Sequence, residues 1–343
     1  MSAPFRQKWA ILLGVTDYQH VQPLKHCVDD VVALRKALLE HLEFEGNHVL
    51  EFGVGLKHAP DFATFWHEAG GFVKSGSIRE DDLLLFYFTG HGIQEKGKDY
   101  LLPRDASPNN LKQTGLAVED VIDQLKQTKC KNIVMFLDAC REAITGKKGV
   151  LSIGAESKTL VERAGIITFF SCDPEQISFE IEDLKHSSFT YCVLEAIQKS
   201  ECSTAGELSD YLLSKVPVLN QRFKKPPQRP YAVIIPDDKR NLPILHSNAR
   251  RLDVLRNYDA TIDQLSILFE DESLSPAHFT LAVEVVSLAK ESPLQGDAAR
   301  KLQWILMLCE GKLSPRAFEA VLASQEKRAQ HDGVALKNLD PIQ

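Results

Sequence analysis

Short apolar runs of strand length, separated by amphipathic stretches, fill the first two thirds of the chain and most constrain its fold. We expect strands at residues 9–15, 48–54, 82–88, 132–137, 165–171 and 231–235. Runs that are apolar at nearly every position fit strands buried on both faces, as in a parallel sheet covered by helices. Helical patterns fall between them, at residues 28–42, 60–74, 118–127, 187–199 and 204–216. The alternation predicts an α/β sandwich with crossover connections.

The last third of the chain changes character. The basic, proline-rich segment 222–229 (RFKKPPQR) predicts an exposed loop before the last strand, and from residue 246 apolar positions recur at helical spacing. We therefore expect two domains, an α/β domain at 1–245 and a helical domain of unknown role at 246–343. Leu-Ser-Pro at 274–276 recurs 39 residues later, and because Ser-Pro is a helix-opening pair, each copy should begin a helix. The copies indicate duplicated helical hairpins or a shared cap signal alone.

Composition narrows the class of partner. The 343 residues include 40 basic and 47 acidic side chains, a net charge of -7, which argues against neutralisation of nucleic-acid phosphates and fits a basic protein substrate better. Seven cysteines without C-x-x-C or zinc-finger spacing indicate free thiols, and favour a cytoplasmic location. No apolar stretch approaches the roughly 20 residues that cross a bilayer, and the first run is better explained as a strand than as a signal peptide. We expect neither nucleic acid nor membrane as a partner.

Two reactive residue types stand at the ends of consecutive predicted strands. The third run passes into Thr-Gly-His-Gly at 89–92 and the fourth into Asp-Ala-Cys-Arg at 138–141. Since residues past the carboxyl ends of strands face the ligand crevice of an open α/β sheet, His91 and Cys140 should lie side by side. Alone, each residue is more often structural, but together they supply a thiolate nucleophile and a general acid for acyl transfer. The N–H groups of Gly92 and Cys140 are candidates for an oxyanion hole.

These motifs make the chain resemble the caspase-like cysteine peptidases over about residues 8–236. The caspase signature places Ala-Cys-Arg after a histidine about 50 residues upstream, and here His91 and Cys140 are 49 residues apart. The chain departs from that signature at Asp138, where caspases have Gln, and at Glu142, where they have Gly.

The chain is more similar to metacaspases and their bacterial relatives. Residues 24–30 read LKHCVDD where those proteins have a pattern like L-x-x-C-x-N-D, and Ser-Cys-Asp-Pro follows in order at 171–174. The resemblance implies an α/β fold, a caspase-hemoglobinase-like three-layer sandwich with about six mostly parallel strands. The all-α C-terminal domain lies outside it.

The resemblance also implies an acidic S1 pocket, the pocket for the substrate side chain before the scissile bond (P1). Caspases line S1 with Arg and Gln and take Asp, whereas metacaspases line it with acids and prefer Arg or Lys. By position, the metacaspase S1 residues match Cys27, Asp30, Thr89 and Asp138. Ser178 and Glu180 fall where caspases have the Ser and Arg of Ser-Trp-Arg, so Glu180 replaces a pocket arginine. Carboxylates there pair with a guanidinium. The alternatives are a helix N-cap for Asp30, a turn for Asp138 and a solvated Glu180.

Many metacaspases need calcium, held by an acidic cluster after the catalytic histidine. Hard cations need several oxygen ligands. Between residues 91 and 106 this chain has Glu95, Asp99 and Asp105, interleaved with three basic residues. We therefore expect no metal and no other cofactor. Calcium is the alternative, although no acidic cluster supports it.

Taken together, the residues and the resemblance imply a cysteine endopeptidase that cleaves protein substrates after Arg or Lys. Cys140 attacks and His91 serves as acid and base, while the helical domain recruits or binds a regulatory protein. The same-fold alternative is a catalytically silent caspase-like binding module, against which the intact His91, Gly92 and Cys140 count. A doubly wound nucleotide-binding protein is disfavoured, because no G-x-G-x-x-G or Walker loop follows a strand. Resemblance to bacterial caspase-like proteins suggests a regulated role such as stress response or phage defence.

The stretch 141–163 suggests a zymogen, an enzyme held inactive until it is cut. Its Gly and Ser content without clear periodicity predicts a mobile, exposed loop of the kind that proteases cleave. Lys147, Lys148, Lys158 and Arg163 are residues that an acidic S1 pocket would accept. We hypothesise processing at Lys147 or Lys148 by the enzyme itself or by a trypsin-like protease. A solvated basic loop without regulatory meaning is the alternative.

Overall fold

The chain folds into two compact units, seen in a computed structural model. The structure describes residues 5–140, 154–174, 176–199, 201–245, 258–291, 296–309, 311 and 313–331. One unit lies within Ser2–His246 and the other within Ser247–Gln343. In these described residues no helix is both long enough and apolar enough to cross a membrane.

The first unit contains every strand and helix that the sequence predicted before residue 236. Its strands are β1 (Lys8–Gly14), β2 (Val49–Phe52), β3 (Leu83–Glu95), β4 (Lys98–Leu101), β5 (Leu116–Ala117), β6 (Asn132–Cys140), β7 (Ile167–Phe170), β8 (Glu180–Ile181), β9 (His186–Ser187) and β10 (Tyr231–Val233). Its helices are α1 (Cys27–His41), α2 (Phe62–Lys74), α3 (Leu111–Thr114), α4 (Val118–Lys126), α5 (Ala155–Ala164), α6 (Ser188–Gln198) and α7 (Ala205–Arg222), with short 3₁₀ helices at Gly46–His48, Glu182–Leu184 and Asp237–Asn241. Strands β3 and β6 and helix α7 extend beyond their predicted ends.

One twisted sheet organises this unit. In the part of the chain that the structure describes, six strands follow one another across the sheet in the order β10-β7-β6-β3-β1-β2. Strand β10 runs antiparallel to β7, and the other neighbours in this path are parallel. Strands β4 and β5 extend β3 by antiparallel pairing, and β8 pairs with β9 separately. The predicted sheet of about six mostly parallel strands is confirmed.

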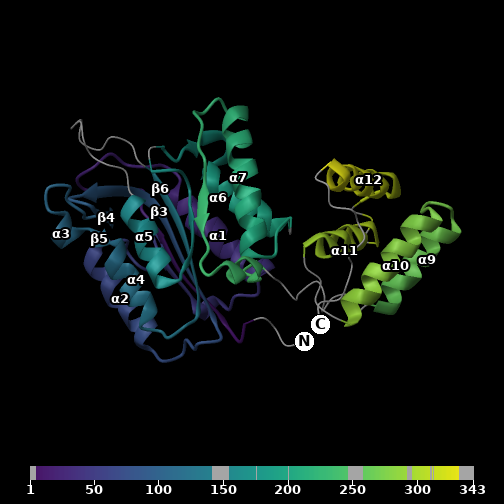
Figure 1. Cartoon of the computed structure of the whole chain (residues 1–343), viewed down its shortest axis with the longest axis horizontal. Helices are drawn as coiled ribbons and strands as arrows, with labels where there is room; N and C mark the ends of the chain where they lie inside the picture. Colours follow the sequence, from purple (N-terminus) through teal and green to yellow (C-terminus); the bar gives the residue numbers. More distant parts are fainter. Residues whose placement is uncertain are drawn as a thin grey trace. The chain divides into compact units, whose positions relative to one another are not determined.

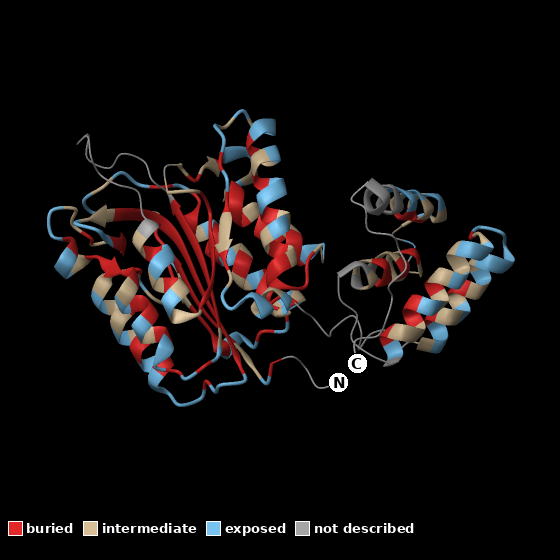
Figure 2. Cartoon of the chain, viewed as in Figure 1, coloured by how far each residue is buried: buried red, intermediate tan, exposed pale blue. Residues whose placement is uncertain are grey.

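Helices cover both faces of the sheet. In β3, Leu83, Leu85 and Tyr87 pack in one buried cluster with residues of α1, α6 and α7. The alternate residues Leu84 and Phe86 pack in a second cluster with residues of α2, α4 and α5. Figure 1 shows these two sets of helices on opposite sides of the sheet, and Figure 2 shows the buried strands between them. Burial on both faces explains why the strands are nearly continuous apolar runs, and the predicted three-layer sandwich is confirmed.

The structure corrects the prediction of one exposed loop over residues 141–163. Residues 155–164 form α5, so Lys158 and Arg163 lie on a helix. The carboxylate of Asp99, which is fully buried in β4, accepts hydrogen bonds from the N–H (2.8 Å) and hydroxyl (2.6 Å) of Ser157 in the first turn of α5. This N-terminal anchor comes from a strand far away in the sequence, and α5 itself has few apolar residues, so no local pattern revealed the helix.

The second unit is helical. Its described helices are α9 (Tyr258–Glu270), α10 (Pro276–Glu291), α11 (Gly296–Cys309) and α12 (Pro315–His331). Helices α10 and α12 begin at the prolines of the two Leu-Ser-Pro copies, as the sequence predicted. Ser275 accepts a hydrogen bond from the N–H of His278, and Ser314 accepts one from the N–H of Ala317. Both serines therefore cap their helices.

The two turns before these helices have the same geometry. The N–H of Leu274 donates to the carbonyl oxygen of Leu268 (2.9 Å), and that of Leu313 donates to Met307 (3.0 Å), each six residues earlier. Two positions before each of these leucines the backbone is left-handed, with φ of +60° at Glu272 and +68° at Gly311. Equivalent turns 39 residues apart favour duplicated helical hairpins, α9–α10 and α11–α12, over a shared cap signal alone.

Candidate active site

The predicted dyad lies on neighbouring strands. In the parallel pair of β3 and β6, His91 is the register partner of Cys140, two positions beyond the partners Thr89 and Asp138. Both strands continue past their apolar runs, so these residues lie within the strands and not just after them. Cys140 is followed by residues 141–153, and Lys147 and Lys148 in that segment lie outside the described residues.

The loop between β1 and α1 holds His91 at two points. The imidazole Nε2 lies 2.8 Å from the carbonyl oxygen of Gln22, and the backbone N–H of His91 donates to the Tyr18 hydroxyl at 2.7 Å. The Tyr18 and His91 ring centroids are 4.8 Å apart. Because a carbonyl oxygen only accepts hydrogen bonds, Nε2 carries a proton, and proton exchange with a thiol falls to Nδ1.

The glycines around His91 fit this close packing. A Cβ at Gly90 would lie 2.6 Å from the Tyr18 hydroxyl oxygen, so a side chain there would displace the tyrosine. Gly92 is buried in β3 and pairs with Leu101 of β4. The N–H groups of Gly92 and Cys140 as oxyanion-hole donors stay a prediction.

Two buried aspartates lie beside the dyad strands. Asp138 of β6 has no exposed surface, and Asp30 in the first turn of α1 is 1% exposed. Ser187 joins them: its N–H lies 3.3 and 3.4 Å from the two carboxylate oxygens of Asp30, and its hydroxyl donates to Asp138. The Thr89 hydroxyl lies 3.5 Å from Asp30, and Cys27 begins the same helix, fully buried. The structure thus brings together the four residues predicted for S1.

Burial strongly affects the charge states of these groups. It raises the pKa of Asp138, and it raises the pKa of Asp30 well above its usual range, with the neighbouring Asp138 charge adding to the effect. Burial also raises the pKa of the Cys27 thiol, and the charges of Glu180 and Asp30 raise it further. A cation placed between such carboxylates would favour their ionised forms. The arrangement therefore suits a ligand with a positive charge.

The sequence did not reveal several polar partners of the aspartates. His186 Nδ1 lies 2.7 Å from Asp30, and burial lowers the pKa of His186, which favours a neutral imidazole that donates to the carboxylate. Asp138 accepts hydrogen bonds from the hydroxyls of Ser178 (2.7 Å), Thr190 (2.9 Å) and Ser187. Ser187 was recognisable as an N-cap, because it precedes a helix and accepts from the Thr190 N–H, but its second bond to Asp138 has no sequence signal.

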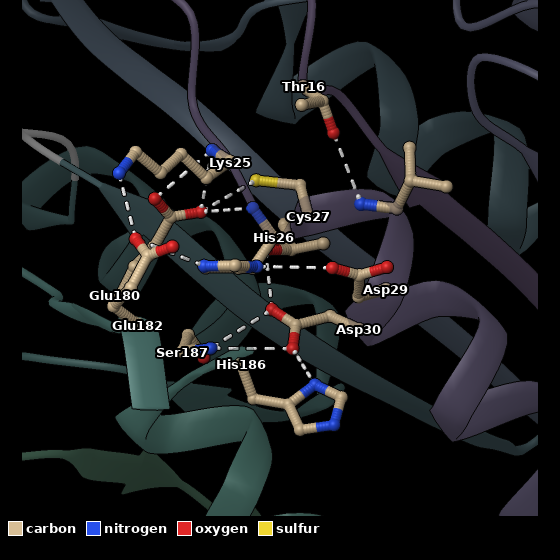
Figure 3. A network of polar contacts seen from close by, with 12 residues as sticks. Thr16, Lys25, His26, Cys27, Asp29, Asp30, Glu180, Glu182, His186 and Ser187 are labelled. Atoms are coloured by element: carbon tan, nitrogen blue, oxygen red, sulfur yellow. Dashed lines mark hydrogen bonds and ion pairs between the residues drawn. The ribbon is translucent and has the colours of Figure 1, made fainter. Parts of the chain in front are cut away.

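Glu180 caps helix α1. Its carboxylate accepts hydrogen bonds from the backbone N–H groups of Lys25 (3.1 Å) and His26 (2.7 Å) and lies 4.0 Å from the Cys27 sulfur. Figure 3 shows this carboxylate at the start of α1, with Asp30 and His186 nearby. The anion pairs with the N–H of the N-cap residue His26 and of the residue before it, and it lies at the positive end of the helix dipole. Glu180 is half-buried and hydrogen-bonded rather than solvated alone, and its described contacts fix the start of the helix that carries Cys27 and Asp30.

A surface cavity reaches this region. It has a volume of about 200 Å³ and is lined by Leu24, Lys25, Ser178, Phe179, Glu180, Glu182 and Lys225. Lys25 and Glu182 form an ion pair at its edge, with Nζ and Oε2 2.8 Å apart. Ser178 lines the cavity and also donates to Asp138, so this one residue lies between the cavity and that carboxylate.

Within the described ranges, no group of three or more His, Cys, Asp or Glu side chains is arranged to hold a metal ion. Asp99, one of the acids that follow His91, instead anchors α5. Whether the protein uses calcium or any cofactor stays a matter of prediction from the sequence.

Comparison with protein families decides the class of the chain. A family model described as the caspase domain matches residues 7–251. The chain belongs to this family of cysteine peptidases. The match includes the sheet, the strands that carry His91 and Cys140 and the two buried aspartates, and it confirms the resemblance to caspase-like peptidases. Protein substrates follow from the family, whereas the closer likeness to metacaspases stays a prediction. No curated protein matches the chain.

Proposed function

We propose that this caspase-family protein is an active cysteine endopeptidase that cleaves proteins after Arg or Lys. The observation that carries the proposal is the register of β3 and β6, which sets His91 against Cys140 and Thr89 against Asp138. Asp138, the proposed carboxylate for the P1 side chain, therefore lies two residues before the nucleophile Cys140 on the same strand. Intact dyad residues favour catalysis over the alternative, a silent binding module.

The proposed chemistry is acyl transfer through a thioester. His91 takes the Cys140 proton, and the thiolate attacks the carbonyl carbon of the scissile peptide. The N–H groups of Gly92 and Cys140 stabilise the oxyanion. His91 then protonates the leaving amine, the C–N bond breaks, and an activated water releases the acid product from the thioester. The carbonyl of Gln22 holds the imidazole in the orientation that these proton transfers need.

The preference for Arg or Lys follows from the buried carboxylates. Burial raises the pKa of both Asp30 and Asp138, and repulsion by the Asp138 charge raises the pKa of Asp30 further. A guanidinium or ammonium offsets that repulsion, whereas a substrate carboxylate would add a third negative charge. We therefore assign Cys27, Asp30, Thr89 and Asp138 to S1, with Ser178 and Glu180 supporting it through Asp138 and α1.

Fluorogenic peptides that differ only at P1 test the proposal. We expect kcat/KM for Arg and Lys peptides to exceed that for Asp peptides by orders of magnitude, about 2–4 kcal/mol or more. Hydrolysis of none of the peptides by a folded protein, whether uncut or cut at Lys147 or Lys148, would favour the silent binding module. A preference for P1 Asp would refute the acidic S1 pocket.

Removal of the helical unit should leave the catalytic site intact. The helical unit has a buried cluster of its own, and the site residues all lie in the first unit. A chain that ends at Leu245 should therefore hydrolyse small peptides with kcat/KM close to that of the full chain and differ mainly in protein substrates or regulation. Loss of small-peptide hydrolysis in a soluble, folded truncation would show that the helical unit completes the active site.

We also propose that cleavage at Lys147 or Lys148 activates the enzyme. Support comes from the sequence: both residues are basic, as the proposed S1 pocket requires, and they lie between the nucleophile strand and α5. Wild type and Cys140→Ala should be incubated side by side and new N-termini sequenced. Self-processing predicts fragments that begin at Lys148 or Gly149 in wild type only. A wild-type chain that stays uncut and is fully active would remove the hypothesis.

For the biological setting we propose a regulated cytoplasmic protease of a bacterial stress or defence pathway. The six cysteines whose side chains the structure describes are free thiols, in keeping with a reducing compartment. The pathway rests on the likeness to bacterial caspase-like proteins, and the helical unit is the candidate surface for a regulatory partner.

A further inference from the structure

Gln228 is a buried residue in a segment that the sequence predicted to be an exposed loop. The neighbouring residues Pro226, Pro227 and Arg229 are exposed, whereas Gln228 is 1% exposed. It follows α7 and precedes β10, so it is distant in sequence from the dyad and from the S1 residues. The structure therefore corrects the exposed-loop prediction at this one position.

The side-chain amide of Gln228 is fully engaged. Its Nε2 donates to the carbonyl oxygen of Ser171 (2.8 Å) and to the hydroxyl of Ser178 (3.2 Å). Its Oε1 accepts from the backbone N–H of Phe179 (3.2 Å), from the hydroxyl of Ser188 (2.9 Å) and from the Asn220 amide (3.0 Å). A carbonyl only accepts and a backbone N–H only donates, so these partners fix which end of the amide faces Ser178.

This orientation determines where the Ser178 hydroxyl proton points. The hydroxyl accepts from Gln228 Nε2, so its own proton goes to the Asp138 carboxylate, 2.7 Å away. The same pattern recurs at Thr190, which donates to Asp138 (2.9 Å) and therefore accepts from the Tyr87 hydroxyl, at 2.6 Å. In both cases a hydroxyl donates to Asp138 and accepts a hydrogen bond from a second donor. The second donor is Gln228 for Ser178 and Tyr87 for Thr190.

Donors that face a buried carboxylate favour its charged form over the protonated acid. Burial raises the pKa of Asp138, and the hydrogen bonds from the hydroxyls lower it, so they partly offset the effect of burial. A hydroxyl without a donor behind it can rotate and accept instead, which would stabilise protonated Asp138. The donor behind the hydroxyl, and not only the hydroxyl itself, therefore controls how well Asp138 attracts a cation.

We propose that Gln228 is a positioning residue for S1, which orients the Ser178 hydroxyl toward Asp138 and so keeps this carboxylate ionised for a cationic P1 side chain. The inference rests on the proposed cleavage after Arg or Lys. It assigns a specificity role to a residue outside the motifs that revealed the site. Gln228 acts through Ser178, and it also holds the Phe179 backbone at the wall of the neighbouring cavity.

The test compares substrates with Arg and with citrulline at P1, because citrulline has nearly the shape of arginine without its charge. We expect Gln228→Met to lower the ratio of kcat/KM for Arg to that for citrulline by about tenfold, mainly through KM for the Arg peptide. General distortion of the site would reduce kcat/KM for both substrates alike and leave their ratio unchanged. Alkylation of Cys140 by iodoacetamide, which needs no S1 pocket, should keep its wild-type rate.

A matched control and a second variant complete the experiment. Gln221→Met makes the same substitution at an exposed position of α7 and should leave the ratio at the wild-type value. Tyr87→Phe removes the donor behind Thr190 while keeping the buried ring, and should lower the ratio like Gln228→Met. Should Gln228→Met fail to fold, Gln228→Glu takes its place, because it keeps the shape and the Oε1 acceptor but lacks the Nε2 donor that faces Ser178.

The outcomes separate the two proposals. Wild type that prefers Arg to citrulline, with folded Gln228→Met and Tyr87→Phe variants that share its ratio, would overturn the inference and leave the proposed function standing. Wild type without any preference for Arg would overturn the cationic P1 specificity and, with it, the role of Gln228.

Discussion

Cys140→Ala is expected to abolish peptide hydrolysis, with a loss in kcat of about 10⁶-fold, the size found when a hydrolase loses its nucleophile. Alanine has no thiolate and no other group that can form the acyl intermediate. The strand should persist, because the pairing of β6 with β3 and β7 is made by backbone groups. Thermal unfolding should therefore change little, which separates loss of chemistry from loss of fold.

The other cysteines provide the control. Cys27, Cys130, Cys172, Cys192 and Cys202 are buried, whereas Cys309 in the helical unit is partly exposed. Burial raises the pKa of Cys130 to about 11, so such thiols are unreactive at neutral pH. Cys309→Ala should keep full activity. Preferential labelling of a cysteine other than Cys140 by iodoacetamide, together with activity in Cys140→Ala, would show that the nucleophile is misassigned.

The central sheet was predictable because its strands are buried on both faces. Near-continuous apolar runs such as 82–88 and 132–137 therefore identified β3 and β6, although not how far each continues. The two-residue strands β8 and β9 are too short to produce a pattern. Helix α5 was missed for a different reason, since its N-terminus is anchored by Asp99 from a distant strand.

The site was predictable only where a strand or a motif marks the residue. His91 and Cys140 could be paired from their positions after consecutive apolar runs, and the resemblance supplied Asp30 and Asp138. The resemblance also supplied Thr89 and Ser178, which contact these acids. The partners Ser187, Thr190 and His186 were not predictable, because each lies many residues away in the sequence from the acid it contacts. Gln228 lies 50 residues after Ser178, and nothing local distinguishes it from its exposed neighbours.

Asp138→Asn should lower activity without lowering the stability of the fold. Since burial raises the pKa of Asp138, the folded protein binds this proton more tightly than the unfolded chain does. The ionised side chain therefore destabilises the fold above its raised pKa, and this penalty disappears below the unfolded-state pKa of about 4. Asp138→Asn removes the penalty, so the variant should be at least as stable as wild type at neutral pH. Thermal unfolding measured across pH checks this sign.

Activity toward cationic substrates should fall sharply in the same variant. Asp138→Asn leaves the P1 guanidinium facing a neutral amide in a buried pocket, and we expect kcat/KM for Arg and Lys peptides to fall about 30- to 1,000-fold, or ~2–4 kcal/mol. Asp123→Asn, at an exposed position of α4, is the matched control and should change neither activity nor stability. Loss of activity in a variant whose thermal unfolding shows a stable fold would report the S1 charge. Undiminished cleavage after Arg in this variant, or a wild-type preference for P1 Asp, would show that Asp138 does not recognise the substrate cation.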